Sequence, residues 1–257
     1  MAARNRRNRR SRGRFGFLYK LLSLLLILGA IVAGCIVFFR VEEVVIVGST
    51  VYTDEEIIAA ADVEQGDNLF LVNKILVGRK IVSQLPYIDE VNPRRVLPDK
   101  LVFTVTECVS VGIVKGEDGS WWVLDTNCKL LEQGGSELKK QYPVIAGLTP
   151  LMPEEGERLA VSVEEGTKLD ALKQILTALE SRDMLAQVQN VDLTSNSEIY
   201  MRYENRLDVR MPLYSDDFDH LIRVVQQAAA SEALSNGQSG TLDLIVDDGS
   251  QAHFIPD

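Results

Sequence analysis

The feature that most restricts this chain is an uncharged, apolar run near its start. Residues 21–39 are nineteen positions without a charge, and thirteen of them are Leu, Ile, Val or Phe. At about 1.5 Å per residue, a helix of this length reaches roughly 28 Å, close to the hydrocarbon core of a bilayer at about 30 Å. The run therefore predicts a single membrane-spanning helix that anchors the rest of the chain.

Charge is divided between the two sides of this run. Eight basic residues and no acidic residue precede it, whereas all 37 acidic residues come after it. Basic residues beside a span stay in the cytoplasm, so we expect a cytoplasmic N-terminus over 1–20 and an extracytoplasmic body. An acidic body argues against nucleic-acid binding. The residues that form this topology signal are Arg4, Arg6, Arg7, Arg9, Arg10, Arg12, Arg14 and Lys20.

Two other fates of the apolar run are open, and both concern processing. A cleaved signal peptide has a shorter apolar core and a small-residue cleavage site, which this run does not match. The stretch 32–35, Val-Ala-Gly-Cys, resembles a lipobox, after which Cys35 would be lipidated at a new N-terminus. Lipoproteins usually continue with a polar tether, whereas here apolar residues lead into strand-like sequence. We therefore expect Cys35 to be an ordinary small residue of a membrane helix.

The first segment of the body contains helix-start signals in two places. Thr53 is followed three residues later by Glu56, a capping box that predicts a short helix over 54–61. Asn73 is a preferred cap for a second helix, which Pro86 ends. Apolar residues at helical spacing are the ones expected to cover a sheet: Ile57, Ile58 and Ala61 in the first helix, and Ile75, Leu76, Val82 and Leu85 in the second.

Three strands are predicted around these helices, over 41–47, 88–96 and 101–106. Alternation in the third strand places Leu101, Phe103 and Val105 on one face. The resulting order, β-α-α-β-β over 40–108, predicts an α+β unit with two helices on one face of a small sheet. Three short strands make a marginal core, so we expect this unit to lean on the domain C-terminal to it.

The remainder, 109–246, is rich in strands and predicts a second, mixed domain, followed by a polar tail over 247–257. A helix with Leu172, Ile175, Leu176 and Leu179 on its apolar side is expected near its middle. In chain order the expected elements are strands over 110–114, 121–125 and 129–131, a loop over 143–166, a helix over 169–182, strands over 188–193, 199–203 and 207–211, a helix from Asp216 or Asp217 to about Ala233, and a strand over 241–246.

Five stretches follow one another in a specific order: VEEVVIVGSTVYTDEEI, LPYIDEVNPRRVLPDKLVFTVTE, WWVLDTNCKLL, YPVIAGL and LDLIVDDG. Together they resemble the bacterial cell division family FtsQ, called DivIB in Gram-positive bacteria, over residues 15–255. The resemblance implies that the β-α-α-β-β unit is a POTRA domain and that the remainder is the family's β domain. It also implies a septal, single-pass protein that binds FtsL-like and FtsB/DivIC-like bitopic partners and helps regulate septal peptidoglycan synthesis.

The chain departs from the family pattern at two points that concern the fold. Cys128 stands in a hairpin turn where the family usually has glycine, and cysteine does not easily adopt a positive φ. Near the C-terminus, Ile245 and Val246 follow Asp243-Leu244 where an arginine and an aromatic residue are frequent. The second change leaves backbone pairing with a partner possible.

Motifs for catalysis are missing from the sequence. It contains two histidines, no Gly-x-Ser-x-Gly or His-Glu-x-x-His pattern and no Gly-rich phosphate loop, so we expect no enzyme, metal or cofactor. Cys108 and Cys128 would lie outside the membrane, where their pairing is permitted but is not indicated by spacing. The rival function is a cell-wall enzyme or ligand-binding lipoprotein with a POTRA-like stalk, lipidated at Cys35.

The last predicted strand, 241–246, ends the regular structure and is expected to be an open sheet edge. Its only charge is Asp243, whereas natural edges are usually protected by lysine, proline or inward charge. We therefore expect a partner to add a strand here by β-augmentation, along Leu242, Asp243, Leu244, Ile245 and Val246. In the alternative, this strand is interior, the tail over 251–255 folds back to pair with it, and Phe254 lies on the edge.

Overall fold

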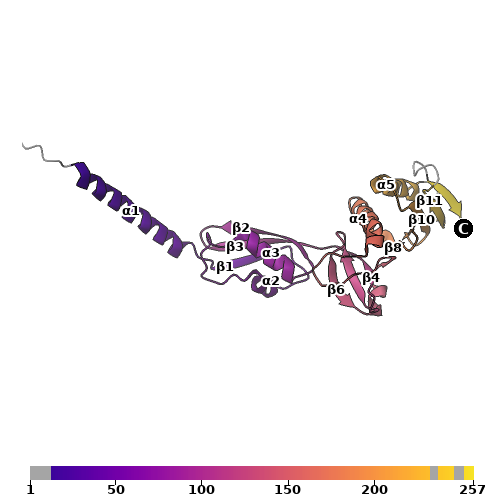
Figure 1. The fold of residues 1–257 in the computed structure, drawn as a ribbon, viewed down its shortest axis with the longest axis horizontal. Helices are drawn as coiled ribbons and strands as arrows, with labels where there is room; N and C mark the ends of the chain where they lie inside the picture. Colours follow the sequence, from indigo (N-terminus) through magenta and orange to yellow (C-terminus); the bar gives the residue numbers. More distant parts are fainter. Residues whose placement is uncertain (1–12, 232–236, 246–251) are drawn as a thin grey trace, which may run out of the picture.

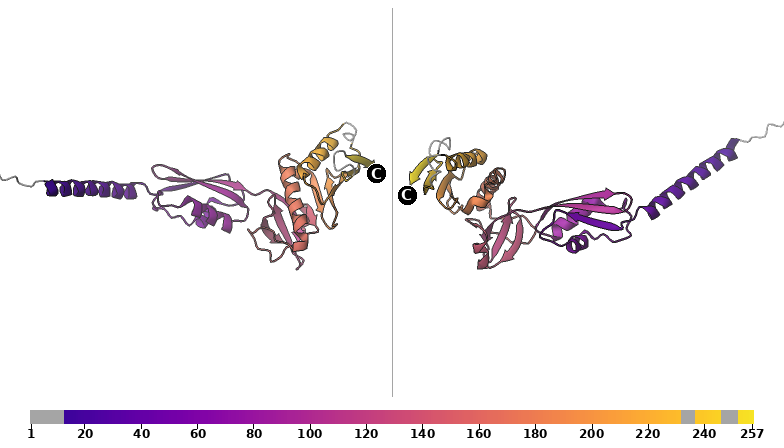
Figure 2. Two further views of the ribbon diagram at one scale, coloured as in Figure 1. Left: turned by 45° about the horizontal axis from the view of Figure 1, so that its top comes forward. Right: turned by 180° about the vertical axis from the view of Figure 1, so that it is seen from behind.

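The computed structural model describes residues 13–231, 237–245 and 252–257, arranged as three successive parts (Figure 1). Helix α1 (Gly13–Phe38) comes first and stands apart from both sheets in all views (Figures 1 and 2). Its stretch Gly16–Phe38 is long and apolar enough to cross a membrane. A three-stranded unit comes next, and then a body with a nine-stranded sheet that ends at the C-terminus. Arg4, Arg6, Arg7, Arg9, Arg10 and Arg12 lie outside the described residues.

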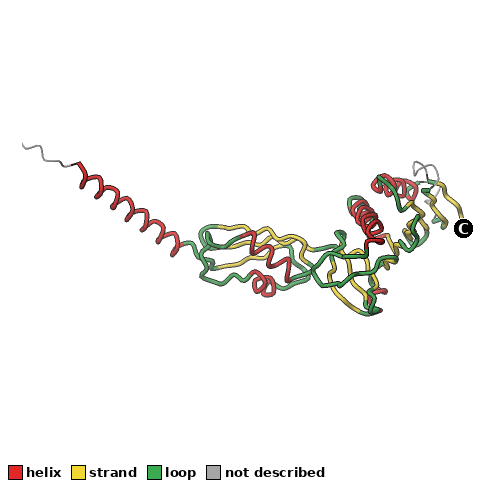
Figure 3. The backbone as a smooth tube through the Cα atoms, in the orientation of Figure 1, coloured by secondary structure: helices red, strands yellow, loops and turns green. Residues whose placement is uncertain are grey.

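The three-stranded unit has the predicted β-α-α-β-β order. In its sheet, β3 lies between the other two strands, parallel to β1 and antiparallel to β2. Both helices lie on one side of the sheet (Figure 2, left), and Figure 3 traces the backbone that joins them. Leu101, Phe103 and Val105 share the buried face as predicted. The elements are β1 (Glu43–Val47), α2 (Asp54–Ala61), α3 (Lys74–Gln84), β2 (Ile88–Val96) and β3 (Lys100–Glu107).

Local hydrogen bonds explain where the two helices of this unit begin. The Glu56 N–H donates to Thr53 Oγ1 at 3.3 Å, and the Thr53 N–H donates to Glu56 Oε2 at 2.8 Å. This confirms the predicted capping box at the start of α2. Asn73 Oδ1 accepts from the N–H groups of Ile75 and Leu76, at 3.1 and 3.2 Å, so α3 also begins at its predicted cap.

The buried face of α3 differs from the prediction. Ile75 and Leu76 are 69% and 52% exposed, while Val77, Gly78 and Ile81 are buried. The reason is a close approach between α3 and β2, since a Cβ at Gly78 would lie only 3.3 Å from the carbonyl oxygen of Val91. The helix turns its smallest residue to the strand. Of the other residues expected to cover the sheet, Val82, Leu85 and Ile58 are only half-buried.

The nine-stranded sheet has the order β12-β11-β10-β9-β8-β7-β4-β5-β6. Helices α4 (Gly166–Glu180) and α5 (Phe218–Ala229) pack against its core face, and all four predicted apolar residues of α4 are buried. Its strands are β4 (Ser110–Lys115), β5 (Trp121–Asp125), β6 (Leu130–Gly134), β7 (Val144–Ala146), β8 (Val188–Asp192), β9 (Glu198–Tyr203), β10 (Leu207–Pro212), β11 (Gly240–Asp243) and β12 (His253–Pro256). Short 3-10 helices cover Ser136–Lys140, Val163–Glu165 and Leu185–Gln187.

Strand β7 lies inside the segment expected to be a loop over 143–166. It pairs parallel with β4 through Ile113 and Val144, and parallel with β8 through three residue pairs. These pairings join the β4–β6 hairpin region to the strands around α4 and α5. A strand of three residues has too little alternation to be seen in the sequence, and its partners are distant along the chain.

Cys128 adopts the conformation that its residue type disfavours, with a φ of 57°. Asp125 stabilises the turn from the preceding strand. Its Oδ1 accepts from the N–H groups of Asn127 and Lys129, at 2.8 and 2.7 Å. An Asx-type turn of this kind replaces the glycine that the turn would otherwise need.

Candidate functional site

Strand β11 is not a sheet edge, so the expectation for residues 241–246 is wrong. β11 pairs parallel with β10 on one side and antiparallel with β12 on the other, where Leu242 faces Phe254. The tail was expected to be a polar extension, but its residues 253–256 fold back as β12. Phe254 packs against the core of the sheet, which gives the fold-back an apolar driving force. The edge is therefore β12, as in the alternative considered from the sequence.

The residues predicted to touch a partner lie mostly behind this edge. Leu242 and Leu244 belong to the core, with 1% and 0% exposure. Asp243 is buried as well, and Ile245 is half-buried just beyond β11. Val246 lies outside the described residues. These side chains hold β12 in place from within the sheet and are not themselves a surface.

The backbone of β12 presents outward-facing polar groups. The Asp257 N–H donates to the carbonyl of Ser239 at 3.4 Å, which sets the phase of the β11–β12 ladder. Facing residues of antiparallel strands alternate between hydrogen-bonded and non-hydrogen-bonded pairs, so the Leu242–Phe254 pair is of the second kind. The N–H and C=O of Phe254 therefore point away from β11, where an added strand would reach them. At the next outward position, Pro256 offers only a carbonyl.

The two faces of β12 differ in chemistry. Phe254 points to the core face, in the same row as Leu242 and Val209. Ile255 lies on the opposite face and is 55% exposed. An added strand would thus meet apolar surface on one face and the sheet's polar side on the other. Ile255 was missed from the sequence, because a strand of four residues at a chain end has too short an alternation to identify.

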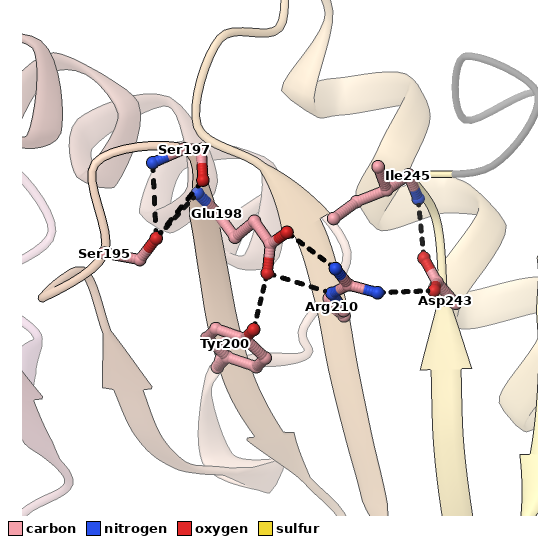
Figure 4. A network of polar contacts seen from close by, with 7 residues as sticks. All are labelled: Ser195, Ser197, Glu198, Tyr200, Arg210, Asp243 and Ile245. Atoms are coloured by element: carbon pink, nitrogen blue, oxygen red, sulfur yellow. Dashed lines mark hydrogen bonds and ion pairs between the residues drawn. The ribbon is translucent and has the colours of Figure 1, made fainter.

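The polar side of the sheet is organised by Arg210, which links three strands (Figure 4). From β10, its guanidinium binds Glu198 of β9 at 2.6 Å and Asp243 of β11 at 2.9 Å. Asp243 also accepts the Ile245 N–H at 2.9 Å through Oδ1. Tyr200 donates its hydroxyl to the same Glu198 carboxylate. This network fixes the end of β11 and with it the register of the strand beside it.

Charge and hydrogen bonding at Glu198 favour its ionised form. Hydrogen bonds from Arg210 and then from Tyr200 lower the pKa of Glu198 to about 2. The same contact with Glu198 raises the pKa of Arg210. Both groups therefore stay charged throughout the neutral and mildly acidic range.

The opposite edge of the sheet, β6, is covered. The Leu130 N–H donates to the carbonyl of Glu157 at 2.8 Å, and the Gly156 N–H donates to the carbonyl of Leu130, also at 2.8 Å. Farther along, the Leu159 N–H donates to the carbonyl of Cys128 at 2.8 Å. The segment 156–159 thus pairs with residues 128–130, where β6 begins, and occupies outward backbone groups of the kind that Phe254 of β12 presents.

Residues 39–107, which comprise the three-stranded unit, match the family model of the FtsQ-type POTRA domain. The chain is 23% identical over 169 residues to the cell division protein DivIB of Clostridium tetani, covering 65% of this chain and 62% of that protein. It is 24% identical over 190 residues to FtsQ of Corynebacterium glutamicum, covering 72% and 77% respectively. It is 28% identical over 152 residues to FtsQ of Syntrophotalea carbinolica, covering 58% and 50%. Residues 39–107 therefore form an FtsQ-type POTRA domain, and the chain is similar to cell division proteins named FtsQ and DivIB.

The family match places the POTRA domain next to the apolar helix. The family model ends at residue 107, where β3 ends, so the nine-stranded sheet and both of its edges lie outside that model. The matched part of the chain spans less than two thirds of the Clostridium tetani relative. What can be said of the second domain of this chain therefore rests chiefly on its structure.

The junction between the POTRA domain and the second domain contains a cluster that sequence spacing did not predict. Asp89, Cys108 and Asp125 place ligand-type atoms within 4.8 Å of one another. Burial raises the pKa of Cys108 to about 12, so its thiol is protonated at neutral pH. The buried Lys129 ammonium donates to the carbonyl of Ile88 at 2.9 Å and links the two domains. Cys108 and Cys128, whose pairing was left open, are both free in the structure.

Proposed function

We propose that this chain is a non-catalytic, single-pass scaffold of the bacterial division machinery, with a cytoplasmic N-terminus and an extracytoplasmic body at the septum. In this proposal an FtsB/DivIC-type partner adds a strand to β12, and an FtsL-type partner joins the same complex. The assembly then helps regulate septal peptidoglycan synthesis. The FtsQ-type POTRA domain and the similarity to FtsQ and DivIB proteins support the division role, and the apolar helix α1 supports the anchored arrangement.

One observation supports β12 as the docking edge more than any other. The two edge strands of the sheet differ, since residues 156–159 pair with the start of β6, whereas Phe254 of β12 has an outward N–H and C=O. In the part of the chain that the structure describes, no strand pairs with the outward side of β12. An edge that is neither covered nor rich in charge is available for β-augmentation, in which backbone bonds give affinity. Pro256 limits the added pairing to a short stretch around Phe254.

The test separates the contribution of the outward Phe254 N–H to partner binding from that of the Phe254 ring. Phe254→Pro deletes both the ring and the N–H, whereas the matched control Phe254→Ala deletes the ring alone. Full-length variants are titrated with the extracytoplasmic segment of the FtsB/DivIC-type protein of the same organism. We expect Phe254→Pro to bind about tenfold more weakly than Phe254→Ala, the effect of losing one hydrogen bond of about 1.4 kcal/mol.

Thermal unfolding shows whether the weaker partner binding of Phe254→Pro comes from the outward N–H or from damage to the fold. The Phe254 N–H does not pair with β11, so both variants should unfold at the same temperature. Equal partner affinity for the two variants would contradict the proposed edge. A lower unfolding temperature for Phe254→Pro would instead show that β12 is paired in another register.

The POTRA domain is proposed to recruit the protein to the division site, because it lies next to the membrane anchor. A fluorescently tagged chain lacking residues 41–107, with the span retained, should reach the membrane but not the septum. Septal localisation of this deletion variant would assign recruitment to another part of the chain. A pull-down of the tagged full-length chain, read by mass spectrometry, tests for the FtsL-type and FtsB/DivIC-type partners.

The lipoprotein rival makes a different prediction at Cys35. Cleavage before Cys35 would remove residues 13–34 of helix α1 and leave Cys35 as the new first residue. In the proposed scaffold α1 is retained as the membrane span, because its stretch Gly16–Phe38 is long and apolar enough to cross a bilayer. Labelling cells with radioactive palmitate should therefore leave the chain unlabelled, and incorporation that disappears in Cys35→Ser would support the rival.

A further inference from the structure

A loop of the POTRA domain returns to the end of helix α1. The N–H of Leu69 donates to the carbonyl of Phe39 at 3.0 Å, and Asn68 forms an isolated bridge with Arg40. The Asn68 side chain also donates to the carbonyl of Ile36 at 3.2 Å, in the last helical turn, where carbonyls lack a partner within the helix. Residues 68–72, which we call the return loop, are thus held against the membrane-proximal end of the domain.

The return loop satisfies its own backbone donors. The N–H of Phe70 donates to Asn68 Oδ1 at 2.9 Å, and the N–H groups of Leu71 and Val72 donate to the carbonyl of Asn68 at 2.9 and 3.2 Å. On the acceptor side, Arg95 Nη2 donates to the carbonyls of Phe70 and Val72, at 3.2 and 2.7 Å. A loop can enter hydrocarbon only when its backbone groups find partners within the protein. The return loop largely meets this condition.

The tip of the return loop is apolar and uncovered. Phe70 is 49% exposed and Leu71 is 78% exposed, although their neighbours Leu69 and Val72 are buried. The Phe70 ring meets the Phe39 ring edge-on, with centroids 5.0 Å apart. Aromatic rings at the ends of membrane spans commonly sit at the boundary between lipid and water.

The tip of the return loop lies beside helix α1, and this position determines what covers its apolar side chains. Between the loop and the helix lies an apolar notch of about 420 Å³, lined on the helix side by residues as early as Ile31, Val32 and Cys35. Ile31 precedes Arg40 by nine residues, or about 13 Å along a helix, which is well inside the hydrocarbon if Arg40 marks the boundary. The apolar surface of the span therefore continues onto Phe70 and Leu71 without a polar break.

We propose that Phe70 and Leu71 insert into the acyl-chain region of the extracytoplasmic leaflet and dock the POTRA domain onto the membrane. This inference rests on the proposed spanning role of α1. The occupant of the notch is lipid, because its walls belong to the span itself. The consequence is a POTRA domain with a restricted orientation, fixed by both the Asn68 contacts and the loop tip.

Brominated lipids, which quench tryptophan fluorescence from within the acyl-chain region, test this insertion directly. Full-length Leu71→Trp is reconstituted in phosphatidylcholine vesicles with and without bromine on the acyl chains. The matched control is Val51→Trp. Val51 is similarly exposed, at 52%, but its N–H binds Glu107 at the far end of β3. The two sites are separated by roughly the length of that strand, about 23 Å.

The native fluorophores give a constant background, because Trp121 and Trp122 are buried in the second domain, at 7% and 5% exposure. We expect the added emission of Leu71→Trp to fall by more than half in brominated vesicles and that of Val51→Trp to be unchanged. Equal responses of the two variants would overturn the inference. Phe70→Trp, which keeps an aromatic ring beside Phe39, is the second reporter if Leu71→Trp unfolds at a lower temperature.

Vesicle flotation separates this inference from the proposed function. If the chain floats with the vesicles and Leu71→Trp is not quenched, the span holds and the return loop does not insert. If the chain does not float, the spanning role of α1 itself fails. If quenching of Leu71→Trp is strong alone but is lost when the FtsL-type partner is co-reconstituted, a partner's helix displaces lipid from the notch.

Discussion

The two edge strands of the nine-stranded sheet are both short, yet their surroundings differ. β6 has a neighbouring segment, 156–159, whose backbone groups pair with Leu130 at its start, whereas β12 has an outward N–H and C=O at Phe254. Edge strands promote unwanted association unless they are covered, charged or interrupted by proline. The contrast shows that protection of an edge depends on what the fold places beside it as well as on its own residues. Among the described strands, it leaves β12 as the edge on which the proposed partner strand would pair.

The greatest loss of stability should come from uncovering β6. Leu159 is 4% exposed and anchors the covering segment, so Leu159→Asp would place an unpaired charge in the core. We expect a loss of about 3 kcal/mol in the free energy of unfolding, together with association at high concentration through β6. Chemical denaturation and light scattering measure the two effects.

Leu151→Asp is the control for Leu159→Asp, because Leu151 is 41% exposed and lies on the surface. Its cost should stay within about 0.5 kcal/mol. If both variants were equally stable and equally monomeric, the cover over β6 would be dispensable and the two edges would differ less than proposed.

A second test weakens the support behind β12. Asp243→Ala removes the acceptor of both Arg210 and the Ile245 N–H, each at 2.9 Å, from a position 6% exposed. We expect a loss of about 1–3 kcal/mol in stability and weaker partner binding. Asp208→Ala removes a similar ion pair, with Arg202 at 2.6 Å, but from a side chain 52% exposed.

The exposed pair should matter less, with a cost of no more than about 0.5 kcal/mol for Asp208→Ala. Unfolding in urea compares the two alanine variants under one condition. Equal losses would mean that burial of Asp243 does not set the strength of its contacts.

A third test detaches β12 itself. Ile255 faces Thr241 in a hydrogen-bonded pair of the β11–β12 ladder, so Ile255→Pro removes an inward donor. We expect it to lower stability by about 1 kcal/mol and to increase amide hydrogen exchange in β11, in addition to weakening partner binding. Relative to Phe254→Ala, which lacks the same ring, Phe254→Pro should affect binding alone. Identical exchange patterns for the two proline variants would contradict the assigned phase of the ladder.

The weakest effect concerns pH. The pKa of Glu198 is lowered to about 2 by Arg210 and Tyr200, so its stabilising contribution is complete above its ordinary pKa of 4.5. That contribution declines as the pH falls from there toward 2. The difference in unfolding temperature between the native chain and Glu198→Gln should therefore shrink between about pH 6 and pH 2.5. A constant difference would show that the Arg210 network does not depend on the Glu198 charge.

Local chemistry was sufficient to predict most of the POTRA domain. Thr53, Glu56 and Asn73 cap their helices through hydrogen bonds that span three residues or fewer, and such signals need no distant partner. The alternation in β3 likewise identifies its buried face. The buried face of α3 was not predictable in this way. Gly78 approaches β2, and that contact depends on how the helix and the sheet pack together.

At the candidate site, too, local signals predicted a strand but not its position in the sheet. The apolar character of Leu242 and Leu244 correctly indicated a strand, but the same character suits an interior strand and an edge. β11 is an interior strand because residues 253–256 pair with it. That segment is too short for its sequence pattern to predict a strand. Ile255 and the outward groups of Phe254 became visible only once that pairing was known.

The amino-acid sequence alone was enough to predict the membrane anchor, the order of the POTRA elements, the main helices of the second domain and the resemblance to FtsQ/DivIB. These properties depend on composition, hydrophobic period and capping, which act over a few residues. Tertiary contacts determined that β7 joins the two parts of the large sheet, that 156–159 covers β6, that β12 is the edge, and that the return loop meets α1. Each of these is a pairing between distant segments, and its stability depends on the surface that both segments bury together.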